Sequence, residues 1–205
     1  MKGLALMAAR GSGSETRRSV LVVAAEIVAR EGVTKLTLDA VAERAGLSKG
    51  GILHHFSTKD SLIAAMIEDL VLQFEEDLAR HMQGESGPGS FARAFLRACL
   101  DSEGTLTRTL RLSAGILAAL AFNMRLLAPL RRCYADWRRR LEDDGIDPAV
   151  AELVRSAADG LWFAGVFDLS PPSIALRKRV FSKLIELTQA ETPAPALAAS
   201  EAAPH

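Results

Sequence analysis

Helical spacing of apolar residues is the feature that most restricts what this chain can fold into. Nearly every patterned segment places its apolar residues three and four positions apart, as an amphipathic helix does. No two alternating segments are joined by a hairpin turn. The sequence therefore predicts an all-α fold of about nine helices, over residues 15–31, 38–45, 49–56, 59–82, 91–100, 105–123, 129–142, 148–167 and 173–188.

The stretch Ala45–Asp60, AGLSKGGILHHFSTKD, combines glycines, histidines and lysines in a way that needs an explanation. A phosphate-binding loop is excluded, because Lys49 precedes the glycines and a helical pattern precedes the loop. A metal site is disfavoured, because His54 and His55 are adjacent and would point about 100° apart on a helix. No metal and no cofactor is therefore expected. Two short helices joined by a glycine-containing turn instead predict a helix-turn-helix motif, whose second helix enters the major groove of DNA.

The glycines of that second helix need a reason, since each weakens a helix by roughly 1 kcal/mol. Gly50 and Gly51 would let the backbone come close to DNA; the alternative is close packing in a helical hairpin that binds nothing. Ser48 caps this helix, whose first amides suit phosphate. Lys49 and His54 are placed to reach base edges or phosphate. The internal core of the motif is expected to consist of Ala42, Ala45, Leu47 and Ile52.

The segment Gly32–Leu62 resembles the N-terminal domain of the TetR/AcrR family of bacterial transcriptional regulators. The resemblance covers about residues 15–65 and rests on a capping threonine, an Ala-x-x-Ala-Gly-Leu-Ser turn, a His-Phe pair and a following lysine. These features are carried by Thr37, Ala42, Ala45, Gly46, Leu47, Ser48, His55, Phe56, Lys59 and Leu62.

The resemblance also implies which residues contact the DNA backbone. Thr37, His55 and Lys59 would contact phosphate. Arg17 and Arg18 would reach the backbone or the minor groove from the N-terminal arm, although a solvated helix start explains these arginines nearly as well. Such contacts position a protein on DNA without specifying sequence.

One departure from the family pattern affects base recognition. The family usually has a tyrosine where this chain has Leu53 and a bulkier residue where it has Gly51. Leu53 offers only apolar contact, for example to a thymine methyl group. Sequence readout is therefore expected to depend on Lys49, His54, the backbone and DNA shape.

Charge is unevenly distributed along the chain. Residues 1–60 carry 9 Lys+Arg and 6 Asp+Glu, a balance of +3, and the rest of the chain offsets this to a net charge of zero. A basic N-terminal third agrees with a polyanionic partner for that part only.

The remainder of the chain is too long to belong to the DNA-binding motif alone. The resemblance implies a flexible N-terminal arm over residues 1–14 and a DNA-binding domain over residues 15–60. Residues 61–190 would then form a helical ligand-binding and dimerisation domain, and residues 191–205 a disordered tail. The helices over 148–167 and 173–188 have wide apolar stripes and small residues. They would pair with their copies in a four-helix bundle of a homodimer, or be buried within one subunit.

A ligand pocket is expected among the central helices, where most of the few aromatic residues gather. Apolar walls with a few polar groups are typical of such pockets, although core packing explains each aromatic residue equally well. Asp159, within an apolar helix, could instead bond a neighbouring helix. The candidate ligand-binding residues are Phe74, Phe95, Cys99, Asn123, Tyr134, Trp137, Asp159 and Trp162.

Two other function classes fit the sequence less well. An enzyme is disfavoured, because no nucleophile elbow, nucleotide loop or metal-spaced cluster is present. A ligand-free architectural DNA-binding protein is disfavoured by the neutral body. We expect a cytoplasmic, homodimeric regulator without a membrane span, more specifically a repressor that a small, mainly apolar ligand releases from near-palindromic double-stranded DNA.

Overall fold

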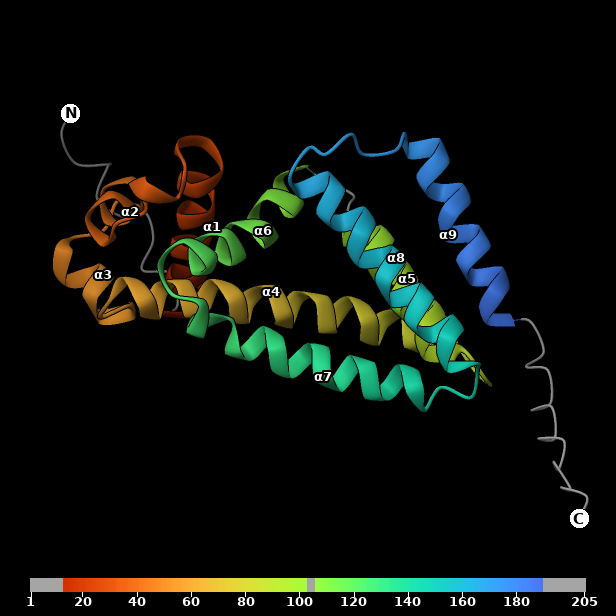
Figure 1. Cartoon of the computed structure of the whole chain (residues 1–205). Helices are drawn as coiled ribbons and strands as arrows, with labels where there is room; N and C mark the ends of the chain where they lie inside the picture. Colours follow the sequence, from red (N-terminus) through yellow and green to blue (C-terminus); the bar gives the residue numbers. More distant parts are fainter. Residues whose placement is uncertain (1–12, 103–105, 190–205) are drawn as a thin grey trace, which may run out of the picture. The chain divides into compact units, whose positions relative to one another are not determined.

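The computed structural model describes residues 13–102 and 106–189, and helices account for all the regular structure in this part of the chain (Figure 1). No strand occurs in the described ranges, so the all-α prediction and the count of nine α-helices are confirmed there. The elements are α1 (Gly13–Glu31), η1 (Val33–Lys35), α2 (Leu38–Ala45), α3 (Lys49–His55), α4 (Lys59–Met82), α5 (Ser90–Ser102), α6 (Leu106–Phe122), η2 (Met124–Leu127), α7 (Ala128–Glu142), α8 (Pro148–Val166) and α9 (Ile174–Gln189).

Local capping chemistry sets several of these boundaries. The Thr37 hydroxyl accepts a hydrogen bond from the Ala40 amide at 3.1 Å at the start of α2. Gly46 ends α2 in the left-handed conformation, with φ of 66°, which a side chain would disfavour. At the start of α8, Asp147 accepts from the Ala149 amide at 2.8 Å. Threonine and aspartate commonly begin helices and glycine commonly ends them, so these boundaries were predictable from the sequence.

The helices form two compact units. The first contains the described residues up to Asp77 and the segment Asp101–Ala135, and the second contains Leu78–Leu100 and the residues from Asp136 onward. The division falls inside α4 and α7, so it differs from the domain boundary expected after residue 60. That boundary stays a prediction, and the expected disordered tail lies outside the described residues.

The first unit has a core that joins α1, α2, α3 and α6 to the first half of α4. Figure 1 shows α1, α2 and α3 gathered around the first turns of α4. The core includes fully buried residues from each of these helices, among them Val20, Ile27, Val41, Ile52, Leu62, Ile63, Ala118 and Ala119.

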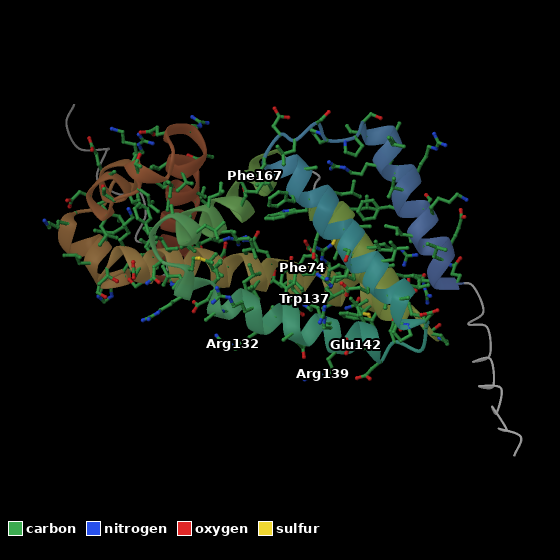
Figure 2. The ribbon with its side chains drawn as sticks, viewed as in Figure 1. Phe74, Arg132, Trp137, Arg139, Glu142 and Phe167 are labelled. Atoms are coloured by element: carbon green, nitrogen blue, oxygen red, sulfur yellow. The ribbon has the colours of Figure 1, made fainter. Side chains whose placement is uncertain are left out.

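The second unit packs around the aromatic residues of α5 and α7. The rings of Phe95 and Trp137 meet edge to face, with 5.7 Å between their centroids, and Trp137 points from α7 toward α5 (Figure 2). The Asp144 carboxylate accepts hydrogen bonds from the Phe91 and Ala92 amides, both at 2.8 Å, and so caps α5 from the loop that follows α7.

A buried ion pair anchors the loop before α5 in the second unit. The Arg93 Nε donates to Glu85 Oε2 at 2.6 Å, and both side chains are almost fully buried. The same guanidinium donates to the carbonyl oxygens of Ser86 and Pro88. Because each buried polar atom of this pair finds a partner, the charges are tolerated in the interior.

In the described ranges, no helix combines the length and the apolar character that crossing a membrane would need.

Candidate nucleic-acid interface

The turn between α2 and α3 closes a helix-turn-helix motif. The Leu47 amide donates to the Ala42 carbonyl at 2.9 Å and the Gly46 amide donates to the Glu43 carbonyl at 3.2 Å. Ala42 and Ile52 are buried in the core of the first unit, and Ala45 and Leu47 are partly buried against the same core. The predicted internal core of the motif is therefore confirmed.

Helix α3 buries one side and exposes the other. Ile52 and, just after the helix, Phe56 are 1% and 2% exposed, which fixes α3 against the first unit. Gly50, Leu53 and His54 are exposed and lie at i, i+3 and i+4, so they share one face. Leu53 is 42% exposed although it is a large apolar residue. This exposed face is the part of the motif that can meet a base edge.

The two glycines differ in their surroundings. A Cβ added at Gly50 would have its nearest neighbour, the Ser48 Oγ, at 4.0 Å. A Cβ at Gly51 would lie 3.3 Å from the same atom, so this glycine relieves crowding with the residue that caps α3. Among the described residues, no atom of another helix lies within 4 Å of a Cβ added at Gly50, so packing between these helices does not require a glycine at this position.

The hydroxyl groups expected at the DNA backbone also cap helices. The Ser48 Oγ accepts from the Gly51 amide at 3.1 Å, as Thr37 does for α2. A hydroxyl that accepts one hydrogen bond keeps its own hydrogen for donation. Capping is therefore compatible with donation to phosphate, and the predicted contact of Thr37 stays a prediction.

The basic side chains near α3 are held to different extents. The Lys49 ammonium lies 3.8 Å from the Asp39 carboxylate, with both side chains largely in solvent, so this pair is weak. The Arg17 guanidinium stacks over the Phe56 ring, 5.3 Å from its centroid, and has Glu68 at 4.0 Å. Arg18 is exposed. Arg17 is therefore partly oriented, whereas Lys49 is mobile enough to exchange its partner for a phosphate.

Lys59 sits in a more defined place at the start of α4. Its ammonium lies over the Phe122 ring, 3.2 Å from the centroid. Partial burial lowers the pKa of Lys59 below its ordinary value, and the charge of Asp60 opposes that shift. Asn123 donates from Nδ2 to Asp60 Oδ2 at 3.1 Å. Sequence reasoning did not associate Phe122 with this site, because no local pattern links residues so far apart in the chain.

His54 and His55 stay beside each other at the end of α3. Their ring centroids are 5.3 Å apart and the planes are close to perpendicular. His55 is half-buried, and its ring also lies beside Phe56. In the described residues, no group of three or more His, Cys, Asp or Glu side chains is arranged to hold a metal ion.

The eight candidate ligand-binding residues are divided between the two units. Phe74, Asn123 and Tyr134 belong to the first unit, and Phe95, Cys99, Trp137, Asp159 and Trp162 belong to the second. Of the first three, Asn123 lies at the end of α6, where its side chain also caps η2 through the Arg125 amide at 3.1 Å.

Two other candidates have partners within the second unit. Phe95 and Trp137 are buried against each other, as core packing requires. The Asp159 carboxylate lies 2.7 Å from the guanidinium of Arg155, one turn earlier on the same helix. This ion-pair partner is therefore on its own helix and not on a neighbouring one. A ligand-binding role for any of the eight stays a prediction.

Helices α8 and α9 expose several large apolar side chains. Leu153 and Phe163 are each 50% exposed and Ile174 is 76% exposed. A Cβ added at Gly160 would meet no atom within 4 Å. The described residues therefore leave apolar side chains of α8 and α9 exposed, which favours a partner surface over complete burial of these helices within one subunit.

Two family models match the chain. One, described as "Bacterial regulatory proteins, tetR family", matches residues 20–66. The other, described as "Tetracyclin repressor-like, C-terminal domain", matches residues 89–189. A curated relative, the HTH-type transcriptional regulator BetI of Paraburkholderia phytofirmans, is 28% identical over 191 residues, which cover 86% of this chain and 95% of that protein.

Solved structures show the same fold. The multidrug binding protein EbrR complexed with imidazole has a TM-score of 0.58 and 22% identity, covering 89% of this chain and 92% of that chain. The SmeT-triclosan complex has a TM-score of 0.63 and 19% identity, covering 85% and 90%.

Proposed function

Because the chain belongs to the TetR family of DNA-binding transcriptional regulators, we propose that it is a repressor that binds a near-palindromic operator as a homodimer and leaves it when a small ligand binds. The observation that carries the DNA-binding part is the exposed face of α3. This face is positioned by the buried Ile52 and Phe56 and has a glycine, Gly50, that no contact among the described residues requires.

Recognition of DNA would divide between two groups of residues. Lys49, Leu53 and His54, with the α3 backbone at Gly50, would face base edges in the major groove. Thr37, Ser48, Gly51, His55, Lys59, Arg17 and Arg18 would line the phosphate backbone around them. Such a division makes the second group responsible for affinity and the first for discrimination between sites.

Dimerisation would use α8 and α9. A partner subunit would bury the exposed apolar side chains of Leu153, Phe163 and Ile174. Gly160 leaves room for a helix of that partner to approach closely. Two copies of a helix pair bury such stripes in a four-helix bundle. A two-fold dimer presents two copies of α3, which explains why a near-palindromic site is expected.

The ligand would be small and mainly apolar, and it would bind among the candidate residues of the central helices. The structural neighbours EbrR and SmeT are complexed with imidazole and triclosan, which supports a small organic ligand for this chain. Helix α4 begins at Lys59 and continues to Met82 without a break. A shift of α4 would therefore change the spacing of the recognition helices. The ligand needs only to bind the DNA-free state a few kcal/mol better to release DNA.

The description "Tetracyclin repressor-like" for residues 89–189 supports repression rather than activation. No catalytic step and no cofactor is part of the proposal. A protein that binds a bacterial operator would act in the cytoplasm.

The test compares three alanine variants on operator and scrambled duplexes at several salt concentrations. Lys49→Ala and His54→Ala should each lose affinity mainly on the operator, by about 1–3 kcal/mol, because they remove base contacts. Lys59→Ala should weaken both duplexes alike and reduce the salt slope by about 1, because it removes a phosphate contact. Equal losses on both duplexes for all three variants would refute this division of roles.

A further inference from the structure

The end of α6 meets the first turn of α4 through two neighbouring side-chain contacts. Phe122 lies under the Lys59 ammonium, 3.2 Å from its ring centroid. The next residue, Asn123, donates to Asp60 Oδ2 at 3.1 Å. Two consecutive residues at one helix end thus engage the first two residues of another helix, and both contacts lie within the first unit.

Close packing of α6 against α4 fixes the distance between these side chains. A Cβ added at Gly115 would lie 3.0 Å from the Met66 Cβ and 3.3 Å from the Ile67 Cδ1, so a side chain here would require α4 atoms to shift. Further along α6, Ala118 and Ala119 are fully buried. The two helices are therefore in close contact along the middle of α6, and this packing places the Phe122 ring beside Lys59.

The Phe122 ring restrains a side chain that would otherwise be flexible. A lysine side chain has many rotamers and loses this freedom on binding, and an ammonium on an aromatic face is held electrostatically. The hydrogens of the ammonium that point away from the ring stay able to donate to a phosphate. A lysine held in advance loses less freedom when DNA binds than a free lysine does.

We propose that Phe122 is a positioning residue for the DNA-backbone contact of Lys59, so that the end of α6 sets part of the DNA affinity. This inference rests on the proposed function, since it assigns Phe122 a role through a lysine expected at phosphate. A movement of the end of α6 would withdraw the ring and weaken DNA binding without any change in α3.

The experiment measures DNA affinity by fluorescence anisotropy for Phe122→Leu, Phe122→Tyr, Lys59→Ala and the Phe122→Leu/Lys59→Ala double variant. Phe122 is 44% exposed, so leucine fits there without a cavity. Leu120→Ala is the matched control, because Leu120 lies on the same helix, is 48% exposed and points in a different direction.

Phe122→Leu should weaken binding to operator and scrambled DNA alike, by about two- to fivefold per half-site, which is the usual strength of an exposed cation–π contact. Phe122→Tyr should bind as the unmodified protein does, because it keeps the ring. In the Lys59→Ala background, Phe122→Leu should have no further effect, since the ring would have no lysine to hold.

A second measurement, the NMR titration of the Lys59 side chain without DNA, separates the inference from the proposed function. Across that titration, the side-chain signals of Lys59 should carry a ring-induced chemical shift in the unmodified protein, because the ammonium lies over the Phe122 ring, and Phe122→Leu should remove this shift. An unchanged affinity for Phe122→Leu, a tighter one, or a loss that persists without Lys59 would overturn the inference. If the unmodified protein fails to prefer its operator, the proposed function itself is wrong and the DNA role of Phe122 falls with it, whatever the titration shows.

Discussion

Replacing Gly50 with alanine should make the protein more stable and its DNA binding weaker at the same time. Gly50 lies in the first turn of α3, and the nearest atom to an added Cβ would be 4.0 Å away. Alanine therefore fits the free protein and favours the helix by about 0.5–1 kcal/mol. For a chain of this size, each 1 kcal/mol raises Tm by roughly 2–4 °C.

The same methyl group should obstruct DNA if the α3 backbone approaches a base edge or phosphate at Gly50. Extra volume in a well-packed contact costs about 1–3 kcal/mol, which corresponds to a loss of roughly 5- to 150-fold per half-site. Thermal denaturation and anisotropy titration on one preparation measure both effects. Gly84→Ala, in the loop after α4, is the control and should leave DNA affinity unchanged. A Gly50→Ala variant that binds operator as tightly as the unmodified protein would refute the close approach of this backbone.

Three further variants or conditions test other parts of the structure. Asp144→Ala should lower the free energy of unfolding by about 1–2 kcal/mol in urea denaturation, because α5 loses its capping carboxylate; an unchanged midpoint would contradict that role. Gly160→Arg should convert the proposed homodimer to a folded monomer in sedimentation velocity, because no atom of the described residues lies within 4 Å of a Cβ added there and the proposed partner would fill this space. A dimer that persists would place the interface elsewhere. Hydrogen bonding from Arg155 holds the pKa of Glu152 below its usual value. The stabilisation from this carboxylate should therefore be complete above its ordinary pKa and disappear as pH falls through the lowered one; an NMR titration of Glu152 that is unaffected by Arg155→Gln would contradict the assignment.

Much of the fold could be predicted because its determinants are local. Thr37, Ser48 and Asp147 cap helices through the amides two or three residues ahead of them. Gly46 ends α2 through a backbone conformation that glycine favours. Such signals are complete within a few residues of sequence, so the boundaries of α2 and α8 follow from reading the chain. The short η1 and η2 contain too few residues to show a hydrophobic period, and neither was expected.

The parts of the site that depend on long-range contacts could not be predicted. The Lys59–Phe122 contact joins residues from two helices far apart in sequence, and nothing local to either residue indicates it. The spacing of α5 places Arg93 opposite Phe91, where solvent is the usual environment, yet Arg93 is buried with Glu85. Burial, unlike capping, depends on which other elements cover a helix face, and that information is not present in the helix's own sequence.

The most direct test of the central claim is a fluorescence-anisotropy titration of the unmodified protein with the DNA upstream of its own gene and with a scrambled duplex, at two salt concentrations. We expect tighter binding to the upstream duplex, with a preference that survives the higher salt, because base contacts by α3 depend less on salt than phosphate contacts do. Weak and equal binding to both duplexes that disappears at the higher salt would contradict a sequence-specific regulator of its own gene.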